Sequence, residues 1–319
     1  MVEPILSLAD VRVHFPTPAG VVRAVDGVSL DVLPGETVGL VGESGCGKST
    51  LGRAARRVGP VGSGTIRLDG RDIGTLSRRE LRPLRPAAQM IFQDPFASLN
   101  PRMTVGRILE EPLIVHGRGN AHERRARVAW LMEKVGLRPE AAARHPHEFS
   151  GGQRQRIGIA RALALEPKLV ICDEPVSALD VSVRAQVINL LTDLRRELGL
   201  AYLFISHDLS VVEHVSDRIA VMYLGKLVEL ADRRTLWTRP LHPYTQALIS
   251  AVPRPDPSAA VVARVRLEGE LPSPIDPPTG CRFRTRCPIA TPACAASEPE
   301  LRDIGGGHRV ACHRVGEAG

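Results

Sequence analysis

Residues 42–49 have the spacing G-x-x-x-x-G-K-S, which is the most chemically specific pattern in this sequence. Glycines at these positions let backbone N–H groups curl around a phosphate, and a helix that starts there adds the positive end of its dipole. Lys48 can then reach the β- and γ-phosphates of a nucleotide, and Ser49 can ligate Mg²⁺. A glycine loop that only makes a turn would not need lysine and serine at these two places. The pattern predicts a phosphate-binding loop formed by Gly42, Glu43, Ser44, Gly45, Cys46, Gly47, Lys48, Ser49 and Thr50.

Two adjacent carboxylates, Asp173 and Glu174, follow the apolar run 168–172. An aspartate at the end of a strand can hold Mg²⁺ through water, and the next glutamate can orient and polarise a water for attack on a γ-phosphate. Taken alone, this pair is equally typical of a solvated strand end. Because the same chain has a phosphate-binding loop, we assign Asp173 to the metal and Glu174 to the general base.

Gln93 and His207 each stand at the end of a predicted strand. Ligands of parallel α/β sheets bind at the carboxyl ends of the strands, so both side chains are candidates for the same site. We expect Gln93 to contact Mg²⁺ or the attacking water, and His207 to contact the γ-phosphate. Without that position, Gln93 would be an ordinary surface glutamine and His207 a structural histidine.

The elements that must position these residues are indicated by the periodicity of the apolar residues. Strands are predicted at residues 5–15, 24–32, 37–41, 88–92, 168–172, 201–205 and 218–229. Helices are predicted at residues 49–58, within 105–143, at 153–165 and at 183–198. Strands that alternate with helices predict a mostly parallel α/β sheet. After about residue 231 the chain becomes rich in proline and loses its periodicity, so we place a domain boundary there.

Composition is that of a globular protein with a sizeable core, since 43% of the 319 residues are hydrophobic. No apolar run approaches the roughly 18 residues that a membrane helix needs, and the N-terminus lacks the pattern of a signal peptide, so a cytoplasmic protein is expected. The formal charge of +7 would suit nucleic acid or an anionic membrane, but a basic excess of this size is more often a solvated face. Only 3% of the residues are aromatic, so there are few side chains on which the bases of single-stranded nucleic acid could stack. We therefore give nucleic-acid binding little weight.

Six motifs occur in one order along the chain: GESGCGKST, Gln93, FSGGQ, LVICDEP, SALD and SHD. With these motifs the chain closely resembles the ATP-binding subunits of ABC transporters. The resemblance spans essentially the whole chain. It implies an α/β P-loop NTPase (RecA-like) nucleotide-binding domain over residues 1–231, with a helical subdomain over about 96–165 and a C-terminal extension over 232–319. Two such chains pair head to tail in this family, with ATP between them.

The resemblance also implies roles for individual residues. Ser150, Gly151, Gly152 and Gln153 would contact the γ-phosphate of ATP held by the P-loop of the other subunit. Serine hydroxyls and backbone amides at a helix N-terminus suit that role because they bind anions. Asp180 would couple the two sites across the dimer. Phe15 is the best match to the aromatic residue that stacks on adenine.

A finer resemblance is to the oligopeptide/dipeptide importer branch, within it to the F-type subunit that pairs with a D-type sibling. This family also includes importers of nickel, glutathione and other small solutes. The resemblance implies two membrane permeases, an extracytoplasmic solute-binding protein, and a location at the cytoplasmic face of the membrane. Residues 96–111 would face the permeases. The alternative is a soluble ABC ATPase that acts on nucleic acid or ribosomes, but such proteins typically carry two cassettes or a long coiled coil, and neither appears in this sequence.

Four of the six cysteines lie in the C-terminal region, at Cys281, Cys287, Cys294 and Cys312. Their spacing, C-x5-C-x6-C-x17-C, differs from that of common zinc folds, but four thiolates can hold a [4Fe–4S] cluster. The region resembles the tail in which some peptide-importer ATPases carry such a cluster, and Arg282, Arg284 and Arg286 would then surround an anionic site. Zinc and the absence of any metal stay open, whereas a disulfide needs an oxidising compartment. The fifth cysteine, Cys46, is interpreted as a small filler of the P-loop.

Overall fold

The computed structural model describes residues 2–59, 61–252, 267 and 269–315. The chain forms two compact units, each made from separate stretches of sequence. The first unit comprises Met1–Ser7, Asp31–Glu36 and Arg67–Ile205, and the second comprises Leu8–Leu30, Thr37–Ile66 and Ser206–Gly319. Among the described residues, none of the helices combines the length and the apolar character that crossing a bilayer requires.

Three parallel strands form the sheet of the first unit: β6 (Ala88–Ile91), β7 (Leu169–Asp173) and β8 (Ala201–Ile205). Every residue of β7 and β8 is buried, which explains their continuous apolar sequences, because a parallel sheet is covered on both faces. In the register, Ile91 lies opposite Cys172, and Asp173 opposite Ile205. The carboxyl ends of all three strands therefore share one edge of the sheet.

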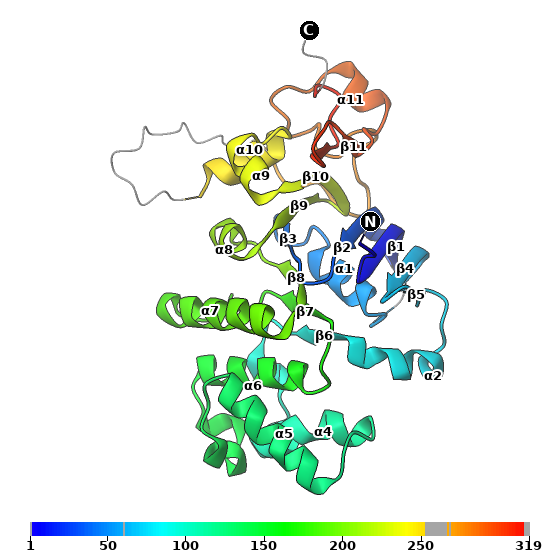
Figure 1. Cartoon of the computed structure of the whole chain (residues 1–319). Helices are drawn as coiled ribbons and strands as arrows, with labels where there is room; N and C mark the ends of the chain where they lie inside the picture. The colour runs from blue at the N-terminus through cyan, green and yellow to red at the C-terminus, as the bar shows by residue number, and fades with distance from the viewer. Residues whose placement is uncertain (1, 60, 253–266, 268, 316–319) are drawn as a thin grey trace. The chain divides into compact units, whose positions relative to one another are not determined.

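The first unit also contains several helices, and the four longest of them lie where the helical periodicity predicted. The main ones are α4 (Val105–Val115), α5 (Ala121–Lys134), α6 (Gly151–Leu163) and α7 (Val181–Leu198), with the short helices α2 (Arg78–Leu81) and α3 (Pro95–Ser98). Helices α4, α5 and α6 pack against one another, and α6 also contacts α7 and β6 (Figure 1). Residues 151 and 181 thus begin two helices that pack together.

In the second unit, β3 (Thr37–Val41) runs parallel to β9 (Arg218–Tyr223), and α1 (Lys48–Ala55) follows β3 through the glycine-rich loop. Helix α8 (Leu209–Val215) packs on β3 at Gly39, where an added Cβ would lie 2.3 Å from the Val212 side chain. Only glycine therefore allows this close approach. Strand β10 (Lys226–Asp232) pairs antiparallel with β9 and also with β12 (Arg309–Val310), which pairs with β11 (Arg302–Asp303).

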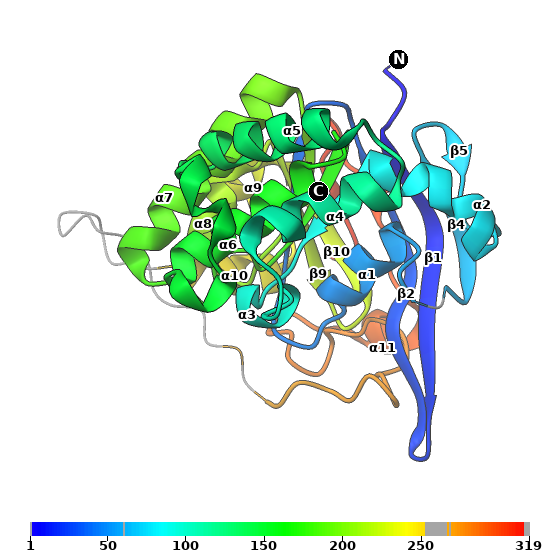
Figure 2. The same ribbon diagram turned by 90° about the horizontal axis from the view of Figure 1, so that it is seen from below.

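A separate sheet contains the two N-terminal strands, β1 (Leu6–Thr17) and β2 (Gly20–Val32), in the order β2-β1-β4-β5. Figure 2 shows β1 and β2 as two long neighbouring ribbons. The other members are β4 (Ser63–Leu68) and the short β5 (Arg71–Asp72). The half-exposed alternation of the first two strands predicted both of them.

Two expectations for the C-terminal half were wrong. The single strand predicted at 218–229 is a hairpin, because Leu224 and Gly225 have φ values of 43° and 82° and reverse the chain between β9 and β10. The proline-rich region also contains regular elements that periodicity missed, namely α9 (Arg233–Thr238), α10 (Pro243–Ser250), α11 (Pro292–Ala296) and the strands β11 and β12. Residues 253–266, 268 and 316–319 of the predicted extension lie outside the described residues.

Candidate functional site

The P-loop, residues 42–50, has the backbone that its glycines predicted. Gly42 and Gly47 adopt φ values of 153° and 109°, and a Cβ would lie 2.1 Å from the Met222 carbonyl oxygen at Gly42 and 1.9 Å from that of Ala24 at Gly47. Both positions therefore need glycine for conformation and for space. Lys48 is buried, and its Nζ donates hydrogen bonds to the carbonyl oxygens of Gly42 at 2.7 Å and Glu43 at 2.9 Å. These bonds close the loop around the lysine head.

Helix α1 begins at Lys48 without a side-chain cap on its first N–H groups. Uncapped N–H groups at a helix start, together with an ammonium group, make an anion-binding position. Cys46 points inward and is buried, and burial raises the pKa of its thiol. A protonated, buried thiol agrees with the filler role. The N-cap itself, Gly47, has a left-handed conformation and offers no side chain that would compete with a phosphate.

Glu43 has further partners that sequence reasoning missed. Its carboxylate accepts two hydrogen bonds from Arg286, at 2.7 and 3.0 Å, and its N–H donates to the Tyr244 hydroxyl at 2.8 Å. Both partners come from the C-terminal region, 243 and 201 residues away along the chain. No local pattern could signal contacts at such separation.

The carboxyl edge of the first unit brings Gln93 and Glu174 together. The Gln93 side-chain amide donates to the Glu174 carboxylate at 3.0 Å. Glu174 has a φ of 48°, an uncommon conformation for a residue with a side chain, and its N–H donates to the carbonyl oxygen of Ile205 at the end of β8. Backbone strain of this kind is typical of functional sites, because the surrounding structure must hold it. Asp173 is buried beside it as the last residue of β7.

The segment SGGQ starts helix α6 with a capping box. The Ser150 hydroxyl accepts from the Gln153 N–H at 3.3 Å, and the Gln153 side chain accepts from the Ser150 N–H at 3.0 Å. Gly152 is explained by packing, because a Cβ there would lie 2.4 Å from the Val183 side chain on α7. Part of this segment is therefore structural. The S-x-x-Q spacing was the available signal, and sequence reasoning did not use it.

Comparison with known proteins supports one family. Residues 25–177 match the family model described as ABC transporter, and residues 228–294 match the one described as oligopeptide/dipeptide transporter, C-terminal region. The oligopeptide transport ATP-binding protein AppF of Bacillus subtilis is 55% identical, with 98% of this chain and 97% of AppF covered. OppF of Salmonella typhimurium is 54% identical, with 98% and 96% covered. The chain belongs to the ATP-binding subunits of oligopeptide/dipeptide ABC transporters.

Solved structures of similar cassettes agree with the fold of this ABC ATPase subunit. A dimeric cassette, MJ0796 with ADP and Pi, is 30% identical and has a TM-score of 0.66, with 72% of this chain and 99% of that chain covered. The cassette cbiO1 of Clostridium perfringens is 27% identical with the same TM-score, covering 74% of this chain and 92% of that one. The predicted fold class, a P-loop NTPase of the ABC type, is confirmed, and so is its activity as an ATPase.

The predicted nucleotide-site residues of this ABC subunit are divided between the two units. The second unit contains the P-loop, the exposed His207 and the half-buried Phe15 on β1, and the first contains Gln93, Asp173, Glu174, the SGGQ segment and Asp180. Asp180 is exposed and stands at the N-cap of α7 without a side-chain capping bond. The predicted magnesium ligands, Ser49, Gln93 and Asp173, offer hydroxyl, amide and carboxylate oxygens. Such hard oxygen donors fit Mg²⁺.

The four C-terminal cysteines form no ready site for a single metal ion. Across the part of the chain that the structure describes, no three His, Cys, Asp or Glu side chains lie where they could hold one. Burial raises the pKa of Cys281 to about 11, with a smaller contribution from the other three thiols, so the four groups lie within electrostatic range of one another. Four cysteine thiols are the donor type that an iron–sulfur cluster takes.

The arginines between the first two cysteines do not surround an anionic site as expected. Arg282 pairs with Asp26, Arg284 donates to Thr279, and Arg286 pairs with Glu43. Two of the three charges therefore neutralise carboxylates elsewhere in the second unit. The expectation of a basic loop around an anion was wrong for Arg282 and Arg286.

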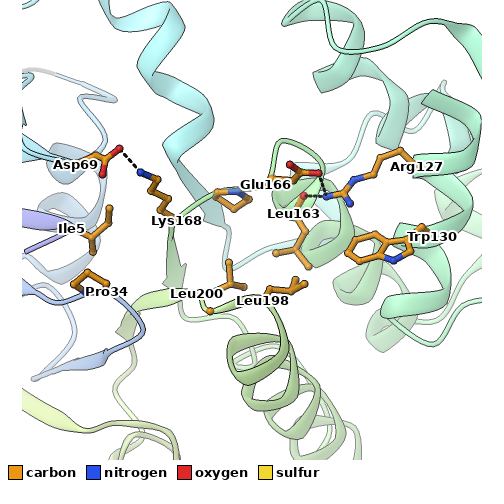
Figure 3. A pocket seen from close by; sticks show the side chains of 12 residues that line it. Ile5, Pro34, Asp69, Arg127, Trp130, Leu163, Glu166, Lys168, Leu198 and Leu200 are labelled. Atoms are coloured by element: carbon orange, nitrogen blue, oxygen red, sulfur yellow. Dashed lines mark hydrogen bonds and ion pairs between the residues drawn. The ribbon is translucent and has the colours of Figure 1, made fainter. Parts of the chain in front are cut away.

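A cavity of about 590 Å³ lies in the first unit, away from all the predicted site residues (Figure 3). Lys168 and Leu200, which line it, come directly before β7 and β8, so the cavity adjoins the amino ends of these strands. Figure 3 shows Arg127 beside Trp130, and Lys168 bound to Asp69 at 2.7 Å. The hydrolytic candidates stand at the opposite, carboxyl ends. None of the candidate ATP-site residues lines this cavity.

Proposed function

We propose that this chain hydrolyses ATP to drive the import of di- or oligopeptides, or a related small solute, through a membrane permease. The observation that carries the hydrolytic part is Glu174, which is held in a strained conformation at the end of a buried strand and hydrogen-bonded to Gln93. The transport part is supported by relatives that match over almost their whole length and are named as oligopeptide transport proteins. These relatives favour transport over the alternative of a ribosome- or nucleic-acid-directed ATPase.

In the proposed reaction, Lys48 and the P-loop N–H groups bind the phosphates of ATP, and Phe15 stacks on adenine. Ser49, Gln93 and Asp173 would hold Mg²⁺, which supplies charge neutralisation of the phosphates when bound. Gln93 suits this because its amide nitrogen is engaged by Glu174, while its oxygen is the atom that a metal would use.

Glu174 orients the attacking water and takes its proton. The water oxygen bonds to the γ-phosphorus as the bond to the β–γ bridging oxygen breaks, and ADP leaves with the electron pair. His207 contacts the γ-phosphate and stabilises its charge. Positioning of this kind is the main requirement of phosphoryl transfer. The hydrogen bond from the Glu174 N–H to the Ile205 carbonyl oxygen holds the backbone from which the Glu174 carboxylate projects.

The proposed partner in hydrolysis is a sibling ATPase subunit of the D type, paired head to tail. Ser150, Gly151, Gly152 and Gln153 would then contact the partner's ATP, with Asp180 coupling the two sites. Ser150 and Gln153 are exposed at the start of α6, and Val181 next to Asp180 is 80% exposed, which suits a surface that a second subunit covers. The capping box fixes the orientation of the Ser150 hydroxyl, so the group is positioned without the partner.

We also propose two permease subunits and an extracytoplasmic solute-binding protein in the full complex, with this chain peripheral at the cytoplasmic face. Residues 96–111 are the proposed permease-facing segment. Ile114 and Val115, just beyond it on α4, are 55% and 52% exposed.

For the C-terminal region we propose a [4Fe–4S] cluster held by Cys281, Cys287, Cys294 and Cys312. The support is chemical: all four cysteines are free of disulfides, and four thiols are the donor set that such a cluster takes. Iron and acid-labile sulfide measured on anaerobically purified protein test this. Zinc in place of iron, or neither metal, would reject the cluster.

The transport proposal is tested by gentle purification of the chain from its native membranes, followed by identification of its partners by mass spectrometry. Two permeases, a second ATPase and a solute-binding protein are the expected companions. Recovery with ribosomes or nucleic acid, and without membrane proteins, would contradict the transport proposal and leave the ATPase assignment standing. A variant with Lys48→Ala should assemble with the same partners but not turn over ATP.

A further inference from the structure

Glu43, the second residue of the P-loop, is held at three different atoms. Its carbonyl oxygen accepts from Lys48 Nζ at 2.9 Å, its N–H donates to the Tyr244 hydroxyl at 2.8 Å, and its carboxylate accepts two bonds from Arg286. The pair with Arg286 uses the planar fork of the guanidinium, which fixes the direction of the carboxylate as well as its distance. Glu43 can therefore neither rotate its peptide nor swing its side chain without breaking one of these bonds.

The two outer partners are themselves fixed. Tyr244 is fully buried and packs against Tyr223 and Phe283, with ring centroids 4.8 and 5.5 Å apart. The side chain of Arg286 is only 8% exposed. Tyr244 is also the second residue of helix α10, where its N–H donates to the ring of the N-cap residue His242. Burial lowers the pKa of His242 to about 3, so this ring is neutral and accepts the bond at any physiological pH.

A second connection joins the same region to the far side of the P-loop. The N–H of Gly225, in the turn between β9 and β10, donates to the Cys46 carbonyl oxygen at 2.9 Å. Arg282 donates to the carbonyl oxygen of Leu224 in that turn at 2.5 Å. Segment 281–287 thus contacts the P-loop directly through Arg286 and indirectly through Arg282.

We infer that Tyr244 and Arg286 are positioning residues for ATP: the C-terminal region sets the curvature of the P-loop by holding the peptide and the carboxylate of Glu43. A phosphate-binding loop works by aiming its N–H groups at one point, and a loop that must first be ordered binds its ligand more weakly. Neither residue touches the phosphates in this account. The inference requires that the P-loop binds ATP, and it is independent of the solute and of any cysteine-bound group.

The test measures binding of a fluorescent ATP analogue to the purified full-length chain and to three variants, Arg286→Gln, Tyr244→Phe and Glu43→Gln. Losing a charge-assisted or buried hydrogen bond should weaken binding by about tenfold in each. Because Arg286 and Glu43 act through each other, the variant with both changes should be no weaker than either alone. Arg286→Lys, which keeps the charge without the fork, should fall between the parent and Arg286→Gln. In the membrane complex, Arg286→Gln and Tyr244→Phe should raise KM for ATP, while kcat stays within about twofold because Gln93 and Glu174 are unaltered.

Arg284→Ala is the matched control, because Arg284 lies in the same loop and bonds to Thr279 instead of Glu43. It should bind the analogue as the parent does. If Arg286→Gln and Tyr244→Phe also bind like the parent, or if the effects of Glu43→Gln and Arg286→Gln add, the inference is wrong. Lys48→Ala distinguishes failure of the P-loop assignment from failure of the role given to the C-terminal region. Unchanged binding in Lys48→Ala would reject the P-loop as the ATP site, whereas a loss in that variant alone would reject only the role of the C-terminal region.

Discussion

Replacing Arg282 by methionine should destabilise the second unit, because it leaves the charge of Asp26 buried. The Arg282 and Asp26 side chains pair with each other and are each 7% exposed. Removing one partner of a buried ion pair costs about 3–5 kcal/mol, since the remaining charge keeps its desolvation penalty. Asp26 retains His14 at 2.9 Å and Arg12 at 3.5 Å, so we expect a loss near the lower end, about 3 kcal/mol. Tm should then fall by about 6–12 °C for a unit of this size.

The loss should depend on pH in a direction that the pKa of Asp26 fixes. Burial alone raises that pKa, but the hydrogen bond and charge of Arg282, helped by His14 and Lys226, lower it below its ordinary value. A carboxylate with a lowered pKa stabilises the fold above its unfolded pKa of about 3.9, and this contribution disappears as the pH falls through the folded value. Without Arg282 the raising effect of burial is opposed only by the smaller lowering effects of His14 and Lys226. The difference between parent and Arg282→Met should therefore be greatest at neutral pH and shrink below about pH 4.

Urea unfolding of the purified chain at pH 7 and at about pH 3 measures both effects. Arg284→Met is the control for loss of one positive charge from the same segment, and it should change stability by less than about 0.5 kcal/mol. Asp26→Asn combined with Arg282→Met removes both charges and should recover most of the loss. A loss below about 1 kcal/mol in Arg282→Met, or no recovery in the double variant, would refute the buried-pair reasoning.

Three further outcomes are expected from the functional segments. Glu174→Gln should keep ATP binding but lower the turnover of the assembled complex by about 10²–10⁴-fold, and turnover at the parent rate would reject Glu174 as the base. Gly152→Ala should destabilise α6 packing by about 1–3 kcal/mol in urea unfolding because of Val183, whereas Gly158→Ala on the same helix, where a Cβ meets nothing within 4 Å, should be neutral or stabilising. Equal effects at the two glycines would contradict this. Cys281→Ser should release iron from anaerobically prepared protein, and retention of the parent iron content would exclude Cys281 as a ligand.

The P-loop was predictable because its requirements are local. The left-handed glycines, the lysine and the helix start all lie within nine residues, and β3 before it has the predicted bounds Thr37–Val41. The spacing of residues at the start of α6 also contained a structural signal, which the sequence analysis did not use. Ser150 and Gln153 form a capping box that the S-x-x-Q pattern could have predicted. The residue types of segment 150–153 therefore predict an anion-binding helix N-terminus, and their spacing predicts the capping box.

Structure in the C-terminal region could not be predicted by the same means. Strand β12 has two residues and pairs with β10 at Glu229 and Leu230, some 80 positions earlier, so no periodicity marks it. Glu229 is fully buried and accepts from the N–H groups of Leu241 and His242, while His308 contacts its carboxylate at 2.7 Å. A buried glutamate with distant partners leaves no local signal. Proline-rich composition hid a region that is ordered by long-range polar contacts.

The segment between Cys281 and Cys287 explains why this region and the ATP site should be considered together. Its residues alternate in function: Arg282 binds Asp26, Phe283 is buried among the aromatic rings, and Arg286 binds Glu43. The two cysteines flank these contacts on either side. The residues that contact the P-loop therefore include side chains more than 200 positions away, and the spacing of the nucleotide motif alone does not reveal them.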